Sequence, residues 1–270
     1  MLRMLTSKAS STMLGCNVYI SEGRDAKVLA ELERAARSTA GVALVHVFVD
    51  EPYHRTGYTL ASGDSTSLGS AVQRLSEAAL QRVDLREHKA SHPRLGVVDH
   101  ISCHPVGPGA DIGHAAGLAR AIGQKLGEET KVPVCLYGAA HPRGAPLSDI
   151  RREHGYFGGA AGGVWSGAEG ITSRVASDFG PVRAEGRMGI TCVGALPWLV
   201  NYNIALETPD LKVARRIARK VSERGGGLPF VQSMALPHAE GVFEVACNLL
   251  DACVSSPEAV HEMVVRLAAE

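Results

Sequence analysis

The sequence predicts an α+β fold with two ferredoxin-like (split βαβ) subdomains, the second lacking its last strand. Apolar periodicity assigns a β-α-β-β-α order to each half of the chain. The strand that begins Gly241-Val242-Phe243-Glu244 repeats the pattern Gly96-Val97-Val98-Asp99, as an internal duplication would. The composition, 45% hydrophobic but only 5% aromatic, provides for an aliphatic core. A β-α-β-β-α-β order is the split-βαβ arrangement, so each half is expected to form one such unit.

The elements of the first half follow from local sequence patterns. Strands are expected at 17–20, 42–49, 57–60, 96–103 and 132–137, and helices at 25–38, 67–83 and 112–129. The first helix carries an apolar face at 3.6-residue periodicity, formed by Val28, Leu29, Leu32, Ala35 and Ala36. The last strand is expected to close this unit. The Gly- and Ala-rich stretch 155–170 has little periodicity, which is typical of a mobile loop.

The second half repeats this order but stops early. Strands are expected at 199–206, 230–236 and 241–250, and helices at 209–223 and 257–269. Thr208 is the expected N-cap of the first helix, with Pro209 at its first position. No closing strand follows, and a bare sheet edge invites pairing, so a truncation, a tail, a partner or a homodimer would account for it. The expected division is 13–188 for the N-terminal subdomain and 189–270 for the C-terminal subdomain.

The composition and the absence of recognisable targeting segments limit the expected partners and the expected compartment of the protein. The 28 basic and 28 acidic residues give no net charge, whereas a nucleic-acid-binding protein usually has a basic excess. No apolar run reaches the roughly 18 residues of a membrane span. None of the six cysteines forms a CxxC pair and no secretory signal precedes them, so buried thiols in a reducing, cytoplasmic compartment are expected. Residues 1–14 lack acids, as transit peptides do, but a flexible tail is the preferred interpretation.

The densest polar cluster spans 86–94, between an expected helix and an expected strand, where loops tend to carry function. Pro93 disfavours a helical conformation at His92, so His92 and Arg94 point to the same side of an extended segment. The charges of Lys89 and Arg94 would lower the pKa of His92 and keep its imidazole neutral at pH 7. A neutral imidazole beside cations suits a general base that acts on an anionic substrate. A solvated loop with a hydrogen-bonded histidine is the alternative interpretation.

Two sets of histidines are candidate metal ligands. His88 and His92 are four residues apart, which would place both on one helix face, but the proline that follows argues against a helix. On the expected strand, His100 and His104 share one face while Cys103 points to the other. Neither set supplies three ligands by itself, so no metal is expected, and a metal-dependent hydrolase is kept as a minor alternative.

Two glycine-containing stretches have compositions that ligand-binding loops also show. Residues 107–113 have the spacing GxGxxxG rather than GxGxxG, so a plain strand-to-helix connection is preferred to a dinucleotide loop. Residues 178–189 contain two arginines and three glycines. The guanidinium fork suits carboxylates, and glycine lets a ligand approach the backbone. A solvated linker between the subdomains would explain the same composition.

Several short segments, spread over nearly the whole chain from about 16 to 266, form a recognisable set in their order and spacing. The segments are Tyr19 to Arg24, Arg55-Thr56 with Tyr58-Thr59, His88-Lys89 through His92-Pro93-Arg94 and Gly96, Val132-Pro133 with Leu136-Tyr137-Gly138, Asp178 to Pro181, Gly194-Ala195, Asn201 to Ile204, and Asn248-Leu249-Leu250. Together they resemble the formiminotransferase domain of formiminotransferase-cyclodeaminase. The run 92–100, together with 215–220, is most similar to the stand-alone, plant-type members of that family.

The resemblance implies a folate-binding transferase built from two ferredoxin-like subdomains, with tetrahydrofolate as co-substrate. The implied reaction, part of one-carbon metabolism and histidine catabolism, moves a formimino group from N-formimino-L-glutamate to N5 of tetrahydrofolate. His92, in the HPR motif, corresponds to the catalytic histidine and would act as general acid and base. The folate-contacting stretch corresponds to Gly180, Pro181, Val182, Arg183, Ala184, Glu185, Gly186, Arg187, Met188 and Gly189. Candidates for holding glutamate carboxylates are Arg55, Lys89, Arg94, Arg183 and Arg187.

Two positions depart from the family pattern. The family usually has Asn where Tyr19 stands and an acidic residue where Phe48 stands. Both changes remove polar groups from the expected cleft, so a non-catalytic folate-binding or scaffold protein is the first alternative. Nothing in the sequence corresponds to the cyclodeaminase domain, so the second activity of the two-domain enzymes is not expected.

Overall fold

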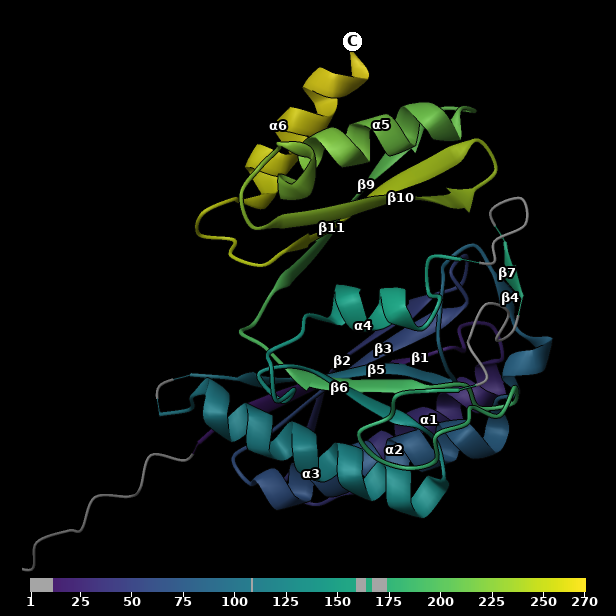
Figure 1. Cartoon of the computed structure of the whole chain (residues 1–270), viewed down its shortest axis with the longest axis vertical. Coiled ribbons are helices and arrows are strands. Elements are labelled where there is room, and N and C mark those ends of the chain that lie inside the picture. Colours follow the sequence, from purple (N-terminus) through teal and green to yellow (C-terminus); the bar gives the residue numbers. More distant parts are fainter. Residues whose placement is uncertain (1–11, 108, 159–163, 167–173) are drawn as a thin grey trace, which may run out of the picture. The chain divides into compact units, whose positions relative to one another are not determined.

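The computed structural model describes residues 12–107, 109–158, 164–166 and 174–270, which form two compact units (Figure 1). Of these residues, the first unit contains 12–88, 94–107, 109–158, 166 and 174–196. The second contains 89–93, 164–165 and 197–270. Both units mix helices with strands, which confirms the α+β class predicted from the sequence.

A six-stranded sheet forms the centre of the first unit, in the order β2-β3-β1-β5-β8-β6. The first four pair with one another in antiparallel fashion, while β8 runs parallel to both β5 and β6. With the helices α1 and α2, strands β1, β2, β3 and β5 have the connectivity of a ferredoxin-like unit. The strands are β1 (Leu14–Ile20), β2 (Ala43–Asp50), β3 (Arg55–Ser62), β5 (Val98–Pro105), β6 (Val134–Gly138) and β8 (Thr191–Ala195).

The closing strand of this unit differs from the predicted one. Strand β5 pairs with β1 and so completes the ferredoxin-like order, whereas β6, predicted to close the unit, lies at the far edge of the sheet. Strand β8 was not predicted, and it joins the sheet between β5 and β6. The first compact unit ends at Leu196, eight residues beyond the predicted end of the N-terminal subdomain at 188.

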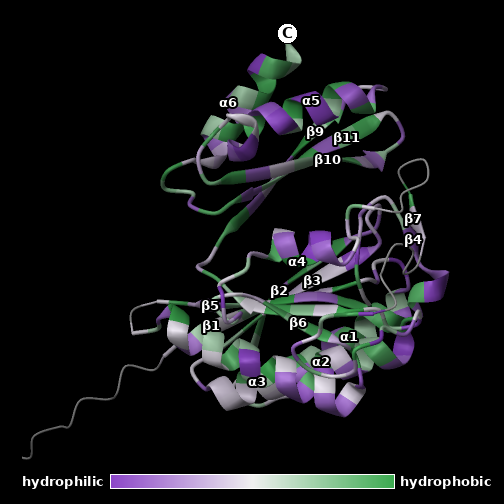
Figure 2. Ribbon diagram, viewed as in Figure 1, coloured by the Kyte–Doolittle hydropathy of each residue, from purple (hydrophilic) through white to green (hydrophobic). Residues whose placement is uncertain are grey.

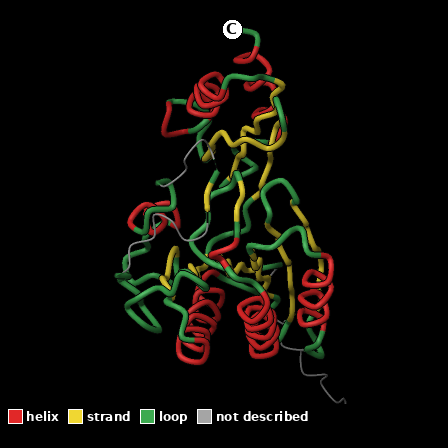
Figure 3. The backbone as a smooth tube through the Cα atoms, turned by 90° about the vertical axis from the view of Figure 1, so that its right-hand side faces the viewer, coloured by secondary structure: helices red, strands yellow, loops and turns green. Residues whose placement is uncertain are grey.

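Three long helices, α1 (Ala26–Arg37), α2 (Ser65–Arg82) and α3 (Ile112–Thr130), cover one face of this sheet (Figure 3, red). Each begins at an aspartate whose carboxylate accepts hydrogen bonds from backbone N–H groups of the first turn: Asp25, Asp64 and Asp111. Their apolar sides pack on the strands to form the main core. The strands are largely hydrophobic, whereas the helices alternate in hydropathy, as amphipathic elements do (Figure 2).

The opposite face of the first sheet is only partly covered. The short helix α4 (Leu147–Glu153) packs there over β6 and β8, around a second, smaller core that includes Ile150, Tyr156 and Cys192. Along β1 and β5 the same face carries polar and aromatic side chains in place of aliphatic ones. We call the part of this face formed by Asn17, Tyr19, His100, Ser102 and His104 the outer face.

The second unit repeats the ferredoxin-like order without its fourth strand. Strands β9 (Val200–Glu207), β10 (Val231–Ala239) and β11 (Val242–Leu249) pair in the order β10-β11-β9, which matches β2-β3-β1 of the first unit. Helices α5 (Leu211–Val221) and α6 (Pro257–Ala268) pack on one another and on this sheet. The N-cap of α5 is Asp210, not the predicted Thr208, because the Asp210 carboxylate accepts from the Lys212 N–H.

Short elements complete the described chain. The 3-10 helix η1 (Leu85–Glu87) precedes β4 (Lys89–Ala90), which pairs with β7 (Trp165–Ser166), and the 3-10 helix η2 (Glu223–Gly225) follows α5. Strand β7 lies inside the stretch 155–170 that was predicted to be a mobile loop, of which 159–163 and 167–170 lie outside the described residues. No helix in the described segments is long and apolar enough to cross a membrane.

Candidate functional site

A column of stacked side chains crosses the outer face. The Tyr19 ring lies 4.3 Å from the His100 ring at an interplanar angle of 12°. The Arg55 guanidinium lies 4.9 Å from the centre of the Tyr19 ring, within the range of a cation–π contact. Gly57 pairs with Tyr19 across β1 and β3, and a Cβ there would lie 3.1 Å from the ring. The column therefore depends on a glycine that lets the tyrosine ring lie flat across the neighbouring strand.

A buried ion pair between Asp99 and Arg151 contacts the His100 ring of this column. Arg151 on α4 donates from Nη2 to Asp99 Oδ2 at 2.7 Å, and their side chains are 14% and 8% exposed. The other oxygen of Asp99 accepts from the Leu95 N–H at 2.7 Å. Burial by itself would raise the pKa of Asp99, but the charge of Arg151, with the hydrogen bond from the Leu95 N–H, holds it well below its usual range. The carboxylate is therefore charged and fixed.

His100, a member of the stacked column, also contacts both residues of this ion pair. Its Nδ1 atom is 3.0 Å from Arg151 Nη2 and 3.3 Å from Asp99 Oδ2. Burial and then the charge of Arg151 lower the pKa of His100 to about 4. The imidazole is thus neutral at physiological pH, a state suited to hydrogen bonding and not to charge pairing.

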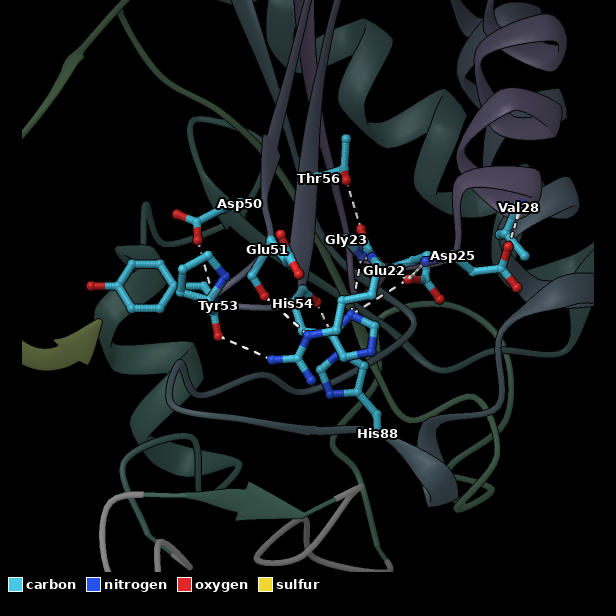
Figure 4. Close-up of polar contacts among 12 residues, drawn as sticks. Glu22, Gly23, Asp25, Val28, Asp50, Glu51, Tyr53, His54, Thr56 and His88 are labelled. Carbon is cyan, nitrogen blue, oxygen red and sulfur yellow. Dashed lines mark hydrogen bonds and ion pairs between the residues drawn. The ribbon is translucent and has the colours of Figure 1, made fainter. Parts of the chain in front are cut away.

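The turn after β1 is built around the Glu22 carboxylate (Figure 4). Its Oε1 accepts from the N–H groups of Gly23, Arg24 and Asp25 at 2.8, 2.7 and 3.0 Å. A Cβ at Gly23 would lie 2.7 Å from the Arg55 nitrogen, so the turn closes tightly only with glycine. The turn is thereby held against the start of β3, next to the outer face.

Two histidines stack beside this turn. The His54 and His88 rings are 4.2 Å apart, and His54 occupies the left-handed region with φ of 49°. His88 Nε2 lies 2.9 Å from the His54 carbonyl oxygen, so this nitrogen donates (Figure 4). Burial lowers the pKa of His54 and takes that of His88 to about 3, with the charge of Arg94 contributing to both. Both rings are therefore neutral, and they pack as a polar pair.

The predicted catalytic segment lies in the second unit. His92 is half-buried, and its Nδ1 lies 2.7 Å from the carbonyl oxygen of Pro93. Lys89 is exposed on β4. Arg94 belongs to the first unit, where burial lowers its pKa to about 10, and Arg55 is part of the outer-face column. Among the described residues, no group of three or more His, Cys, Asp or Glu could hold a metal ion.

The stretch 180–189 runs along the first unit towards β8. Gly180 and Gly189 both have positive φ, and a Cβ at either position would clash with a backbone carbonyl oxygen. Val182 and Arg183 are exposed. Arg187 points away from them and donates to carbonyl oxygens at the C-terminal end of α2, 2.6 Å from Leu80 and 3.1 Å from Gln81. That Arg187 binds a substrate carboxylate stays a prediction. In this structure its guanidinium donates hydrogen bonds to the end of α2.

The sequence patterns did not indicate Asp99, Arg151 or His54 as parts of a site. Arg151 lies 52 positions from Asp99, so no local spacing connects the pair. One indication was present in the sequence: the predicted strand 96–103 is largely apolar but contains Asp99 next to a histidine. A buried carboxylate needs a cationic or hydrogen-bonding partner, and this need was detectable from the sequence.

The fold and these residues define a protein of the formiminotransferase family. Residues 13–196 match the family model described as formiminotransferase domain, N-terminal subdomain. The chain is 43% identical over 265 residues to a formiminotransferase cyclodeaminase-like protein of Arabidopsis thaliana, covering 96% of this chain and 89% of the relative. The chain belongs to this family.

Two further relatives have names that state an activity. A glutamate formimidoyltransferase of Thermoplasma acidophilum is 28% identical over 226 residues, which cover 83% of this chain and 72% of the relative. The formimidoyltransferase-cyclodeaminase of Rattus norvegicus is 32% identical over 270 residues, 96% of this chain and 48% of the relative. The chain thus spans about half the length of that two-activity relative.

Proposed function

We propose that this protein is a folate-binding transferase that moves a formimino group from N-formimino-L-glutamate to tetrahydrofolate, with His92 as general acid and base. The hydrogen bond at His92 supports this role. The Pro93 carbonyl oxygen can only accept, so Nδ1 carries the proton at the 2.7 Å contact. In the neutral form of the ring the lone pair is then on Nε2, which is the atom that would remove a proton.

The proposed reaction balances with this single histidine. N5 of tetrahydrofolate attacks the amidine carbon of the donor, and His92 Nε2 takes the proton that N5 loses. The carbon–nitrogen bond to glutamate then breaks, and the same proton passes from His92 to the departing glutamate nitrogen. A positioned acid–base of this kind contributes about 10²- to 10⁴-fold to a rate.

Cationic side chains would hold the carboxylates of the donor and of the folate tail. Arg55 and Arg94 in the first unit, Lys89 in the second and Arg183 on the exposed part of 180–189 are the proposed residues. Arginine suits this task because its planar fork can bind a carboxylate through two parallel hydrogen bonds.

A non-catalytic folate-binding protein is the second candidate, and two side chains favour it. Tyr19 stacks on His100 where the family usually has Asn, and Phe48 is 53% exposed where the family usually has an acid. Under this alternative, folate binds between aromatic and apolar groups but the amidine carbon is not oriented for attack.

Turnover and binding assays on the full chain distinguish these candidates. Formiminoglutamate turnover is measured with wild-type protein, His92→Gln and the control His114→Gln, an exposed position on α3. Isothermal titration with tetrahydrofolate accompanies each assay. Turnover that falls at least about 100-fold in His92→Gln alone supports the transferase. Turnover unchanged in that variant contradicts the role of His92, and folate binding without wild-type turnover supports the second candidate.

A cytoplasmic location and a homodimer also remain predictions for this protein. Fluorescence imaging of the tagged full-length protein tests the first, and an organelle signal would contradict it. Sedimentation equilibrium tests the second, and a mass of a single chain at micromolar concentration would contradict it.

A further inference from the structure

The contact between Arg151 and His100 fixes which imidazole nitrogen carries the proton. A guanidinium has five N–H donors and no acceptor. At 3.0 Å from Arg151 Nη2, His100 Nδ1 must therefore present a lone pair. In a neutral imidazole the other nitrogen, Nε2, then carries the hydrogen.

The opposite tautomer fits these distances poorly. A hydrogen on Nδ1 would point at Asp99 Oδ2 across 3.3 Å, while two N–H groups faced each other at 3.0 Å. With a lone pair on Nδ1, a single guanidinium nitrogen instead lies between two acceptors, 2.7 Å from Asp99 and 3.0 Å from His100. The second arrangement gives Arg151 Nη2 an acceptor on each side, Asp99 Oδ2 and His100 Nδ1, and it places the cation between the carboxylate and the ring.

Charged and titratable groups on four elements, β3, β5, β8 and α4, lie around His100. Asp99 on β5 favours a protonated ring, whereas Arg151 on α4 and Arg55 on β3 oppose it. Tyr19 on β1 covers one ring face. Cys192 on β8 is its register partner, and burial raises the pKa of that thiol, so it is uncharged. Together with burial, these neighbours lower the pKa of His100 to about 4.

The Nε2 edge of the ring is the one turned away from the ion pair. The side chain of His100 is 13% exposed, and no described residue accepts a hydrogen bond from Nε2. The stacking with Tyr19 at 12° holds the ring plane in one orientation. The ring thus presents a donor of fixed direction on the outer face, which it shares with the guanidinium of Arg55.

We propose that the Asp99–Arg151 pair is a positioning device that presents His100 as a neutral Nε2–H donor, and that this donor binds a carbonyl or carboxylate oxygen of the substrate. The identity of that substrate rests on the proposed folate-dependent function. In this view His100 determines specificity, because a neutral N–H donor of fixed direction selects a substrate that places an acceptor oxygen at this point of the outer face.

Nuclear magnetic resonance of ¹⁵N-labelled histidine side chains tests the positioning device directly. The His100 signals are assigned by comparison with His100→Gln. We expect Nδ1 without and Nε2 with a proton, unchanged between pH 5 and pH 8. A protonated Nδ1, or a titration within this range, would overturn the proposal.

Two variants of the arginine sharpen this measurement. In Arg151→Met the donor is gone and Asp99 faces Nδ1, so the proton should move to Nδ1 and the pKa of His100 should rise. Arg151→Lys keeps a cationic donor and should restore the wild-type tautomer. An unchanged tautomer in Arg151→Met would refute a positioning role; if that variant does not fold, the wild-type spectrum decides alone.

Titration with tetrahydrofolate tests the donor. His100→Leu should bind about 3- to 10-fold more weakly than wild type, as expected for one lost hydrogen bond, while His100→Gln keeps a donor and should stay within about twofold. Equal affinity in His100→Leu and wild type would refute the substrate contact while the proposed function stands. If wild-type protein binds no tetrahydrofolate, the folate function and this substrate contact both fail, whereas the tautomer measurement still judges the positioning device.

Discussion

Acidification should destabilise this protein because His88 and His100 are buried as neutral rings. Burial is the main cause that takes the pKa of His88 to about 3 and that of His100 to about 4. In an unfolded chain a histidine has a pKa of about 6.5. Between that value and the lower folded values the unfolded state binds protons that the folded state does not. Stability is therefore full above about pH 6.5 and is lost as the pH falls towards 3 to 4.

The size of the effect follows from the same pKa values. At pH 5 each histidine is almost fully protonated in the unfolded chain and almost fully neutral in the folded one. Linkage then gives a loss of about 2 kcal/mol for each histidine between pH 7 and pH 5. The two together amount to about 4 kcal/mol, which is a large part of the 5–15 kcal/mol that typically stabilises a domain.

Urea unfolding followed by circular dichroism at pH 7, 6 and 5 measures this loss. The proteins compared are wild type, His88→Gln, His100→Gln and a control, His46→Gln, at an exposed position of β2 in the same unit. Each buried-site variant should lose about 2 kcal/mol less than wild type between pH 7 and pH 5, because glutamine does not titrate. The reasoning is refuted if His88→Gln and His100→Gln keep the pH dependence of wild type.

Three further substitutions have expected outcomes. Arg151→Met leaves the buried Asp99 carboxylate without its cationic partner, so urea unfolding at pH 7 should show a loss of about 3–5 kcal/mol, and a loss below about 1 kcal/mol would contradict the buried pair. Gly23→Ala would put a Cβ 2.7 Å from a backbone nitrogen, so thermal unfolding should begin several degrees lower, and an unchanged melting temperature would show that the turn adapts. Arg187→Met removes two hydrogen bonds at the end of α2 and should lower the free energy of unfolding by about 1–3 kcal/mol. The control Arg183→Met, at an exposed position, should leave it unchanged. An equal loss of stability in the two variants would argue against this structural contact.

The strongly patterned elements were predictable from the sequence, and the short ones were not. Helix α1 combines an aspartate cap with an apolar stripe, and both signals lie within a few residues of each other. Strand β8 has five residues, all buried, so it shows no alternation of polar and apolar positions. Helix α4 has seven residues and no side-chain cap. Their places in the fold are set by pairing and packing with distant segments, which local pattern does not contain.

The same distinction between local and long-range features applies to the candidate site. His92 could be singled out because its proline and neighbouring charges are adjacent in sequence, and the family motif includes it. The ion pair of Asp99 and Arg151 could not, because it joins β5 to α4 across a separation of 52 residues. The tautomer of His100 depends on that pair, so the sequence predicted only the strand face on which this histidine lies.

The transfer reaction itself tests the central claim most directly. Full-length protein is supplied with N-formimino-L-glutamate and tetrahydrofolate, and the formation of 5-formiminotetrahydrofolate is followed for wild type and His92→Gln. The account predicts product from the wild-type protein and a rate at least about 100-fold lower in the variant. Equal rates in the two proteins, or no product from the wild type under conditions where it binds folate, would contradict it.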